Sequence, residues 1–302
     1  MRIFVTGASG WIGSALVPEL TDAGHQVVGL ARSDASADAL ADAGAEVHRG
    51  SLDDAESLRA AAEASDGVIH LAFKHDLAFS GDLQGASDAD RRAIELFGDA
   101  LADSDRPLVI ASGTLGLAEG RVATERDGHD AESAVSPRHA NAELTLSLAA
   151  RGVRSSVVRL SPTVHGDGDS GFVAMIVATA RDKGVSAYIG EGRNRWNAVH
   201  RLDAARLFRL AAEKAPAGST LHAVGDQGVT ISEIAEAIGR QLDVPVESIA
   251  AEKAGEHFGW LGGLLALDSP ASSELTQDLL DWRPSGPGLI EDLDEGHYFV
   301  ER

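Results

Sequence analysis

The chain has 302 residues, 44% of them hydrophobic and none of them cysteine, which allows a sizeable core and excludes disulfides, thiolate metal sites and a cysteine nucleophile. Its formal net charge is −21, and so acidic a surface disfavours nucleic acid and anionic membranes as partners. The sequence contains no apolar run of about 18 residues and no charged-then-apolar leader, which predicts a cytoplasmic protein without a transmembrane helix.

The chain opens with a short apolar run, three glycines and then a helical pattern. Residues 3–5 predict a buried strand, and apolar residues recur at helical spacing from residue 11 to residue 23. Glycines between a strand and a helix let the backbone approach a phosphate, and the helix N-terminus presents free N–H groups to it. We interpret this turn as a dinucleotide-phosphate cradle; the alternative is an ordinary tight turn. The residues expected to contact the cofactor here are Gly7, Ser9, Gly10, Trp11, Ile12 and Gly13.

A second strand is predicted at residues 25–31, and the residues at its end bear on the choice of cofactor. In dinucleotide folds a carboxylate at this position holds the ribose 2′-hydroxyl, whereas a nearby arginine accommodates a 2′-phosphate. Here Ala31 occupies the position, and Arg32 and Ser33 follow. The sequence therefore favours NADP over NAD, and the alternative is that Arg32 simply faces solvent.

The next predicted elements are a short helix at residues 34–44 and a third strand at residues 45–50. Asp53 and Asp54 follow this strand. One of these two acids is expected to cap the next helix, and Asp53 could instead accept a hydrogen bond from the adenine amino group.

A fourth strand is predicted at residues 68–72 and contains His70. A histidine inside an apolar strand is more often a packed, hydrogen-bonded residue than a catalyst, and we interpret His70 in that way. Lys74 and His75 are better placed for a pocket, because open α/β sheets bind ligands beyond the carboxyl ends of their strands.

Residues 80–87 are predicted to form a loop, and residues 88–104 a long helix. A fifth strand at residues 107–111 ends in Ser112, with Thr114 two residues further on. Hydroxyl groups at the carboxyl end of a strand can hydrogen-bond a substrate oxygen, so both are candidate catalytic residues.

The polar residues 116–134 predict a loop over the site, and Pro137 fits the first turn of a helix at residues 137–151. A sixth strand follows at residues 153–160. Strands and helices alternate with short connections up to this point. The order predicts an α/β fold with a Rossmann-type, doubly wound parallel sheet and right-handed crossovers.

We divide the chain into a dinucleotide-binding domain, residues 1–166, and a smaller α-rich substrate lobe, residues 167–302, from which some segments return to the first domain. No metal site is predicted, since the histidines lack ligand spacing and cysteine is absent. In the second part, strands are predicted at 185–189, 196–200 and 219–224, and helices at 171–183, 203–214, 230–243, 253–266 and 271–281.

Taken together, these segments resemble the extended branch of the short-chain dehydrogenase/reductase superfamily, which includes sugar-nucleotide epimerases and dehydratases. The resemblance is carried by residues 6–13, 70–72, 112–114, 159–166 and 197–205. It implies a nicotinamide cofactor, with Ala72 and Pro162 bordering the nicotinamide. The further cofactor contacts that it implies are Leu71, Phe73 and Val164.

The family's proton-transfer pair, Tyr-x-x-x-Lys, is missing from its usual place. Alignment on Glu143 puts the tyrosine position at Val135 and the lysine position at His139, while the only tyrosines are Tyr188 and Tyr298. This departure resembles the atypical members of the superfamily, which keep the cofactor site. Ser112 remains, and Arg138 or His139 could replace the lysine as a ribose or phosphate contact.

Three functions stay open. The first is an NADP(H)-dependent oxidoreductase that transfers hydride to or from a carbonyl, enone or imine-like group of a small substrate. The second is a non-catalytic NADP(H)-binding redox sensor, and the third and weakest is a sugar-nucleotide epimerase or dehydratase, which needs the missing tyrosine as a base. For the first, a histidine suits proton transfer near neutral pH. The candidate proton donors are His139, His165, Lys74, His75 and Tyr188.

Two further expectations concern substrate and partner. Basic residues that could hold a diphosphate are few in the second lobe, Arg193 and Arg195 being the exceptions, while its apolar aromatic residues form either a pocket or core. The predicted helices 88–104 and 137–151 lie where extended family members often pair, so the resemblance implies a homodimer. The aromatic and apolar residues of the second lobe that are expected to form either a pocket or core are Trp196, Phe258, Trp260 and Leu261.

Overall fold

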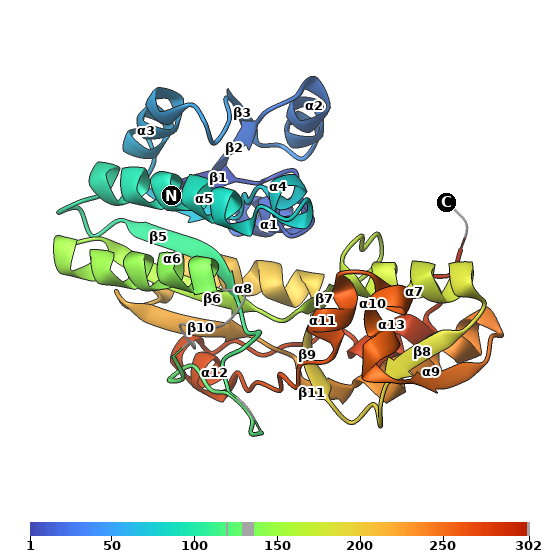
Figure 1. The fold of residues 1–302 in the computed structure, drawn as a ribbon. Coiled ribbons are helices and arrows are strands. Elements are labelled where there is room, and N and C mark those ends of the chain that lie inside the picture. The colour runs from blue at the N-terminus through green and yellow to red at the C-terminus, as the bar shows by residue number, and fades with distance from the viewer. Residues whose placement is uncertain (119, 129–135, 301–302) are drawn as a thin grey trace.

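The computed structural model describes residues 1–118, 120–128 and 136–300, and a seven-stranded parallel sheet lies at its centre (Figure 1). The strands of this sheet are β1 (Arg2–Thr6), β2 (Gln26–Ala31), β3 (Glu46–Arg49), β4 (Gly67–His70), β5 (Pro107–Gly113), β6 (Arg154–Leu160) and β10 (Ser219–Ala223). Their order is β10-β6-β5-β4-β1-β2-β3, so the chain starts inside the sheet and winds outward in both directions. This order confirms the predicted doubly wound, Rossmann-type sheet.

Helices cover both faces of the sheet, and each face has its own apolar core. One core lies beneath α1 (Gly13–Asp22), α2 (Asp34–Asp42) and α8 (Arg201–Lys214). The other lies beneath α3 (Ala55–Glu63), α5 (Leu83–Ala100) and α6 (Ser136–Ser147), which a 3₁₀ turn at Leu148–Arg151 continues. Because side chains alternate along a strand, the neighbours Phe4 and Val5 of β1 point into opposite cores.

Side-chain caps determine where several of these helices begin. Ser33, Asp54 and Asp82 each accept a hydrogen bond from a backbone N–H in the first turn of the helix that follows, at 3.2, 3.0 and 2.8 Å. Asp82 begins α5 five residues earlier than predicted, so part of the expected loop 80–87 is helical. A short helix, α4 (His75–Phe79), lies before it and was not predicted.

The second lobe contains a third apolar core around the fully buried Trp196. A three-stranded sheet, β7 (Thr163–His165), β9 (Arg195–His200) and β11 (Asp226–Thr230), lies beside it, with a two-stranded sheet of β8 (Ser186–Ile189) and β12 (Val246–Ile249). The helices of this lobe are α7 (Phe172–Lys183), α9 (Ile231–Leu242), α10 (Ala254–Phe258), α11 (Leu261–Leu265) and α13 (Leu289–Asp294).

The sequence patterns were least informative in this second lobe. The single helix predicted at 253–266 is two short helices, because Gly259 adopts a positive φ of 61° between α10 and α11. The strands β7, β11 and β12 and the helix α13, which have only three to six residues each, were not predicted.

Two later segments return to the large sheet. β10 is its outermost strand next to β6, and α8 packs against α1. The helix α12 (Glu274–Leu280) lies against β10, and the fully buried Trp282 belongs to the same core as α8. Among the described residues, no helix is long and apolar enough to cross a membrane.

Candidate functional site

The glycine turn between β1 and α1 is built so closely that two of its positions exclude a side chain. Gly7 has a φ of 68°, and a Cβ atom there would lie 2.8 Å from the backbone nitrogen of Ala72. A Cβ atom on Gly13 would collide with the carbonyl oxygen of Gly7. Ser9 and Gly10 are exposed, so the turn opens to solvent just before the N-terminus of α1. This geometry fits a bound diphosphate.

Trp11 connects the glycine turn to the second lobe. Its indole N–H donates a hydrogen bond to the carbonyl oxygen of Val164 on β7 (2.8 Å), and the guanidinium of Arg201 lies 4.3 Å from the ring centre. Two residues expected to contact the cofactor, Trp11 and Val164, therefore bond to each other. Pro162 is half-buried between β6 and β7.

At the end of β2, Ala31 is buried and Arg32 is exposed. Within the described part of the chain Arg32 takes part in no ion pair, because the neighbouring carboxylate of Asp34 binds Arg49 instead (2.7 Å). The hydroxyl of Ser33 belongs to the capping box of α2. Ser33, which was expected to contact a 2′-phosphate together with Arg32, therefore already uses its hydroxyl in the helix cap.

The structure separates the roles of the two acids after β3. Asp54 caps α3, and Asp53 holds the ammonium of Lys74 between its two oxygens at 2.6 and 2.8 Å. This ion pair joins the loop after β3 to the loop after β4. Lys74, a candidate proton donor, is thus held at the adenosine side of the predicted cofactor site.

His70 is confirmed as a packed, hydrogen-bonded residue. Its Nδ1 lies 2.6 Å from the hydroxyl of Thr6 and its Nε2 lies 3.0 Å from Asp90, which also accepts a hydrogen bond from Asn141 (2.7 Å). Burial by itself raises the pKa of Asp90, but the hydrogen bonds from His70 and Asn141 outweigh it and hold that pKa below its ordinary value. This polar chain links β1 beneath the glycine turn to α5 and α6.

The two candidate hydroxyls at the end of β5 differ in their surroundings. Thr114 has both Leu160 O and Asn197 Oδ1 within hydrogen-bond distance (3.2 and 3.1 Å), so its hydroxyl holds the chain in place. Ser112 is only 3% exposed, and among the described residues its hydroxyl has no hydrogen-bond partner. Of the two, Ser112 is the one available to a ligand.

The start of α6 places a cation next to the predicted nicotinamide side. The guanidinium of Arg138 lies 4.3 Å from the ring centre of Phe73, which follows the Ala72 that touches Gly7. Burial lowers the pKa of Arg138, and the negative charge of Asp90 opposes that shift. His139, one residue further on, is buried in α6. Val135, at the expected tyrosine position, lies outside the described residues.

A buried polar row crosses three strands and joins Ser112 to two residues that the sequence analysis did not name as candidates. Ser112, Arg159 and His222 are register neighbours on β5, β6 and β10. Arg159 donates to the backbone oxygen of Asp127 (2.8 Å), and burial lowers its pKa to about 10. Burial lowers the pKa of His222 to about 4, so His222 is neutral at pH 7. A polar residue within an apolar strand was the available signal.

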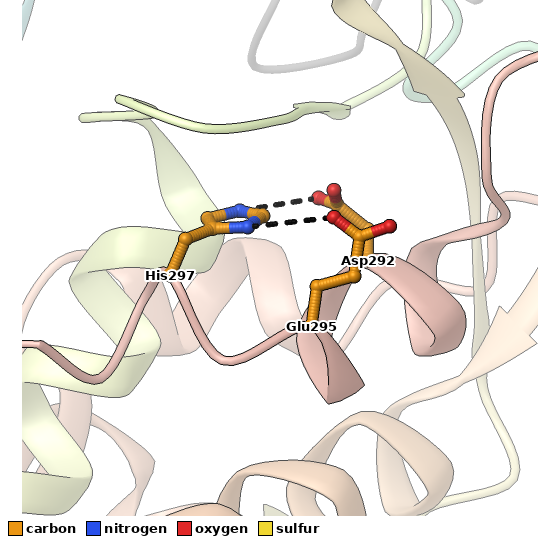
Figure 2. Close-up of side chains that lie close together, drawn as sticks. All are labelled: Asp292, Glu295 and His297. Carbon is orange, nitrogen blue, oxygen red and sulfur yellow. Dashed lines mark ion pairs between the residues drawn. The ribbon is translucent and has the colours of Figure 1, made fainter.

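Another titratable group lies in the second lobe, at the end of α13 (Figure 2). His297 places one ring nitrogen 3.6 Å from Asp292 and the other 3.9 Å from Glu295. Within the described ranges these three residues are the one group that could supply three ligands to a metal ion. Each ring nitrogen of His297 therefore faces a different carboxylate.

The remaining candidate proton donors lie on three different elements. The Nδ1 of the buried His165 lies 2.9 Å from Asp292. Tyr188 lies on β8, packed against Gly192, at the end of the second lobe remote from β5 (Figure 1). His75 begins α4, beyond the carboxyl end of β4. The sequence could not place His165, because its partner Asp292 lies far away along the chain.

The fold and the glycine cradle are those of a dinucleotide-binding protein with a Rossmann-type sheet. Residues 3–84 match the model of the NAD dependent epimerase/dehydratase family. A Schizosaccharomyces pombe protein described as uncharacterized is 48% identical over 300 residues, covering 99% of this chain and 100% of that protein. One from Saccharomyces cerevisiae, also described as uncharacterized, is 44% identical over 295 residues, covering 97% and 98%. The chain belongs to this family.

Two further comparisons agree with this assignment. A Stigmatella aurantiaca enzyme, 4-hydroxy-2-methyl-3-oxo-4-farnesyl-3,4-dihydroquinoline-1-oxide ketoreductase, is 25% identical over 280 residues, covering 86% of this chain and 80% of that protein. The solved structure of MoeE5 with UDP-glucuronic acid and NAD has a TM-score of 0.75 at 23% identity, covering 98% of both chains. The second likeness concerns the fold.

Proposed function

We propose that this protein is an NADP(H)-dependent oxidoreductase that transfers hydride to or from a carbonyl, enone or imine-like group of a small apolar substrate. The carrying observation is the buried hydroxyl of Ser112, which lacks a hydrogen-bond partner among the described residues. A buried hydroxyl without a hydrogen-bond partner lowers the stability of the folded protein by about 1–3 kcal/mol. A substrate oxygen at the end of β5 would supply that partner. NADPH held in the glycine cradle would supply hydride chemistry, and the hydroxyl of Ser112 would donate a hydrogen bond to the substrate oxygen.

The preference for NADP rests on Arg32. It is exposed beyond β2, and the acid beside it is paired with Arg49. An unpaired guanidinium beside the ribose favours a 2′-phosphate, and the buried Ala31 offers no carboxylate to a 2′-hydroxyl. Arg138, whose guanidinium lies 4.3 Å from the ring centre of Phe73, is suited to take over the ribose or phosphate contact of the family lysine.

The sugar-nucleotide alternative requires cations for a second diphosphate. Arg193 and Arg195 are each paired, with Glu191 (3.2 Å) and Asp268 (2.8 Å). MoeE5, which has a similar fold, was solved with UDP-glucuronic acid, so a panel of sugar nucleotides belongs in the activity screen as a competing outcome.

The cofactor preference is tested by titrating the protein with NADPH and NADH and following nicotinamide fluorescence. A charged hydrogen bond contributes about 1.5–3 kcal/mol, so we expect NADPH to bind at least about tenfold more tightly than NADH. Arg32→Ala should remove this difference, whereas Arg240→Ala, on the exposed surface of α9, should keep it. Equal affinities in the unmodified protein would contradict the role of Arg32.

The reaction is tested by following NADPH oxidation with carbonyl, enone and imine compounds. We expect Ser112→Ala to lower kcat about 10²- to 10³-fold with little change in NADPH affinity, as removal of a donor to a developing oxyanion does. Tight NADPH binding with no turnover of any compound would favour the redox-sensor alternative. An unchanged rate in Ser112→Ala would remove Ser112 from the site.

A further inference from the structure

A row of aromatic rings runs from the end of β4 into the second lobe. It starts at Phe73 and continues through His75 and Phe79 to Trp260 and Phe172. Successive ring centres are 5.2, 5.6, 5.2 and 6.0 Å apart. The first three residues belong to the large domain and the last two to the second lobe, so the row spans both parts of the protein.

Two rings in the middle of this row are large, apolar and open to solvent. Phe79 is 52% exposed and Trp260 is 47% exposed, and their planes stack at 25°. Phe79 ends α4 and Trp260 lies between α10 and α11. Figure 1 shows α4 on the side of the large domain nearest to those two helices. Each ring therefore has one face against its partner and much of its remaining surface exposed to water.

The start of the row is next to the cofactor cradle. Phe73 directly follows Ala72, whose backbone nitrogen would lie 2.8 Å from a Cβ atom on Gly7. Arg138 covers the Phe73 ring and supplies the positive charge at this end. Further out the row is uncharged: the desolvation of His75 and the nearby charge of Arg138 lower the pKa of that imidazole, which is neutral at pH 7.

We propose that Phe79 and Trp260 form an aromatic entrance to the substrate site and that the substrate carries a flat, apolar ring, as in an aromatic aldehyde or ketone. This inference rests on the proposed oxidoreductase function. A flat ring can stack on exposed aromatic faces, whereas a saturated ring cannot approach them as closely. Contact between two aromatic rings shifts a binding or conformational equilibrium by about two- to tenfold, so the stacked rings of Phe79 and Trp260 separate at a small cost in free energy.

The test compares two molecules of similar size and different shape. Benzyl alcohol and cyclohexylmethanol are titrated into the protein loaded with NADP⁺, and saturation-transfer NMR gives each dissociation constant without requiring turnover. We expect benzyl alcohol to bind about two- to tenfold more tightly. Trp260→Leu and Phe79→Leu should bring the ratio close to one, while Trp260→Phe, which keeps a flat ring, should retain most of it.

Leu267→Ala is the matched control, because Leu267 is also exposed (42%) in the second lobe and makes no ring contact. Its ratio should equal that of the unmodified protein. A ratio that Trp260→Leu leaves unchanged would overturn the proposal. So would light scattering that shows a dimer converted to a monomer by Trp260→Leu, since a second copy of the chain would then cover the rings.

Kinetics with benzaldehyde and cyclohexanecarbaldehyde separate this inference from the proposed reaction. If both aldehydes are reduced with equal KM, the reaction stands and the aromatic entrance is wrong. If neither is reduced but the preference for benzyl alcohol depends on Trp260, the entrance stands and the proposed reaction fails for these carbonyl compounds.

Discussion

At the scale of single residues, the glycine turn depends on positions that carry no side chain. Gly13 touches the backbone of Gly7, and no side chain fits between them. The buried polar residues contribute in the opposite way, because each needs a partner: His222 bonds to the carbonyl of Ser272 (2.8 Å) and faces Arg159 (3.4 Å). Both kinds of position allow sharp tests.

We predict that Gly13→Ala weakens NADPH binding at least about tenfold, because even a small shift of the cradle from the ligand geometry has a large effect. Fluorescence titration measures the affinity. Gly255→Ala is the control, since a Cβ atom there meets nothing within 4 Å, and it should bind NADPH normally. Normal binding by Gly13→Ala would show that the turn does not hold the cofactor.

His222 should make the protein less stable in mild acid. Its pKa is about 4 in the folded protein against 6.5 for an ordinary histidine, so between these values the unfolded chain binds more protons. The free energy of unfolding should therefore fall by up to about 1.4 kcal/mol per pH unit as the pH drops from 6.5 towards 4. Urea unfolding of the wild type and His222→Gln measures this, and parallel pH profiles would contradict it.

At the scale of secondary-structure elements, a polar chain fastens α5 and α6 to the sheet beneath the glycine turn. Asn141 of α6 donates to Asp90 (2.7 Å) and to the backbone oxygen of Ser87 (2.8 Å), and Asp90 reaches His70 on β4 (3.0 Å). All these groups are buried. Apolar packing on the same face of the sheet contributes stability but is not directional. These hydrogen bonds need specific partners, so they fix the register of the two helices.

Asn141→Leu should lower the free energy of unfolding by about 1–3 kcal/mol, because it leaves a buried carboxylate oxygen of Asp90 without its donor. Gln84→Leu is the matched control, since Gln84 makes a similar bond to Asp88 on the exposed face of α5 (2.8 Å). We expect the control to stay within about 0.5 kcal/mol of the wild type in urea unfolding. Equal losses in both variants would contradict a role for burial.

At the scale of the whole molecule, charge decides how two copies could meet. The exposed face of α5 carries Asp88, Arg91, Arg92, Glu95 and Asp99. We propose that the homodimer implied by the resemblance forms through α5 and α6. Because a two-fold axis brings the same surface of both copies together, arginines of one copy can then meet acids of the other.

Such a dimer should be sensitive to salt. Sedimentation equilibrium at about 50 mM and about 1 M salt should show weaker association at the higher concentration, since screening then acts over about 3 Å. Arg91→Glu combined with Arg92→Glu should favour the monomer, while Arg240→Glu on α9 should not. A monomer at every salt concentration, or a dimer indifferent to salt, would contradict the charged interface.

The sequence by itself determined the Rossmann sheet, the glycine cradle and the packed role of His70. These features depend on local patterns: apolar strands, helical spacing, and glycines at positions where a side chain would cause strain or a collision. The order of the strands followed from the short connections that alternate with helices. Nothing in these patterns requires knowing what lies across the molecule.

Only the tertiary structure decided which candidate side chains remain available. Thr114 bonds to Asn197, Lys74 bonds to Asp53, and His165 bonds to Asp292. The stack of Phe79 on Trp260 likewise joins residues from different lobes. The sequence identifies candidate hydroxyls, cations and aromatic rings. Residues distant along the chain form hydrogen bonds or ion pairs with some of them and leave others exposed. That competition is settled only when the chain is folded.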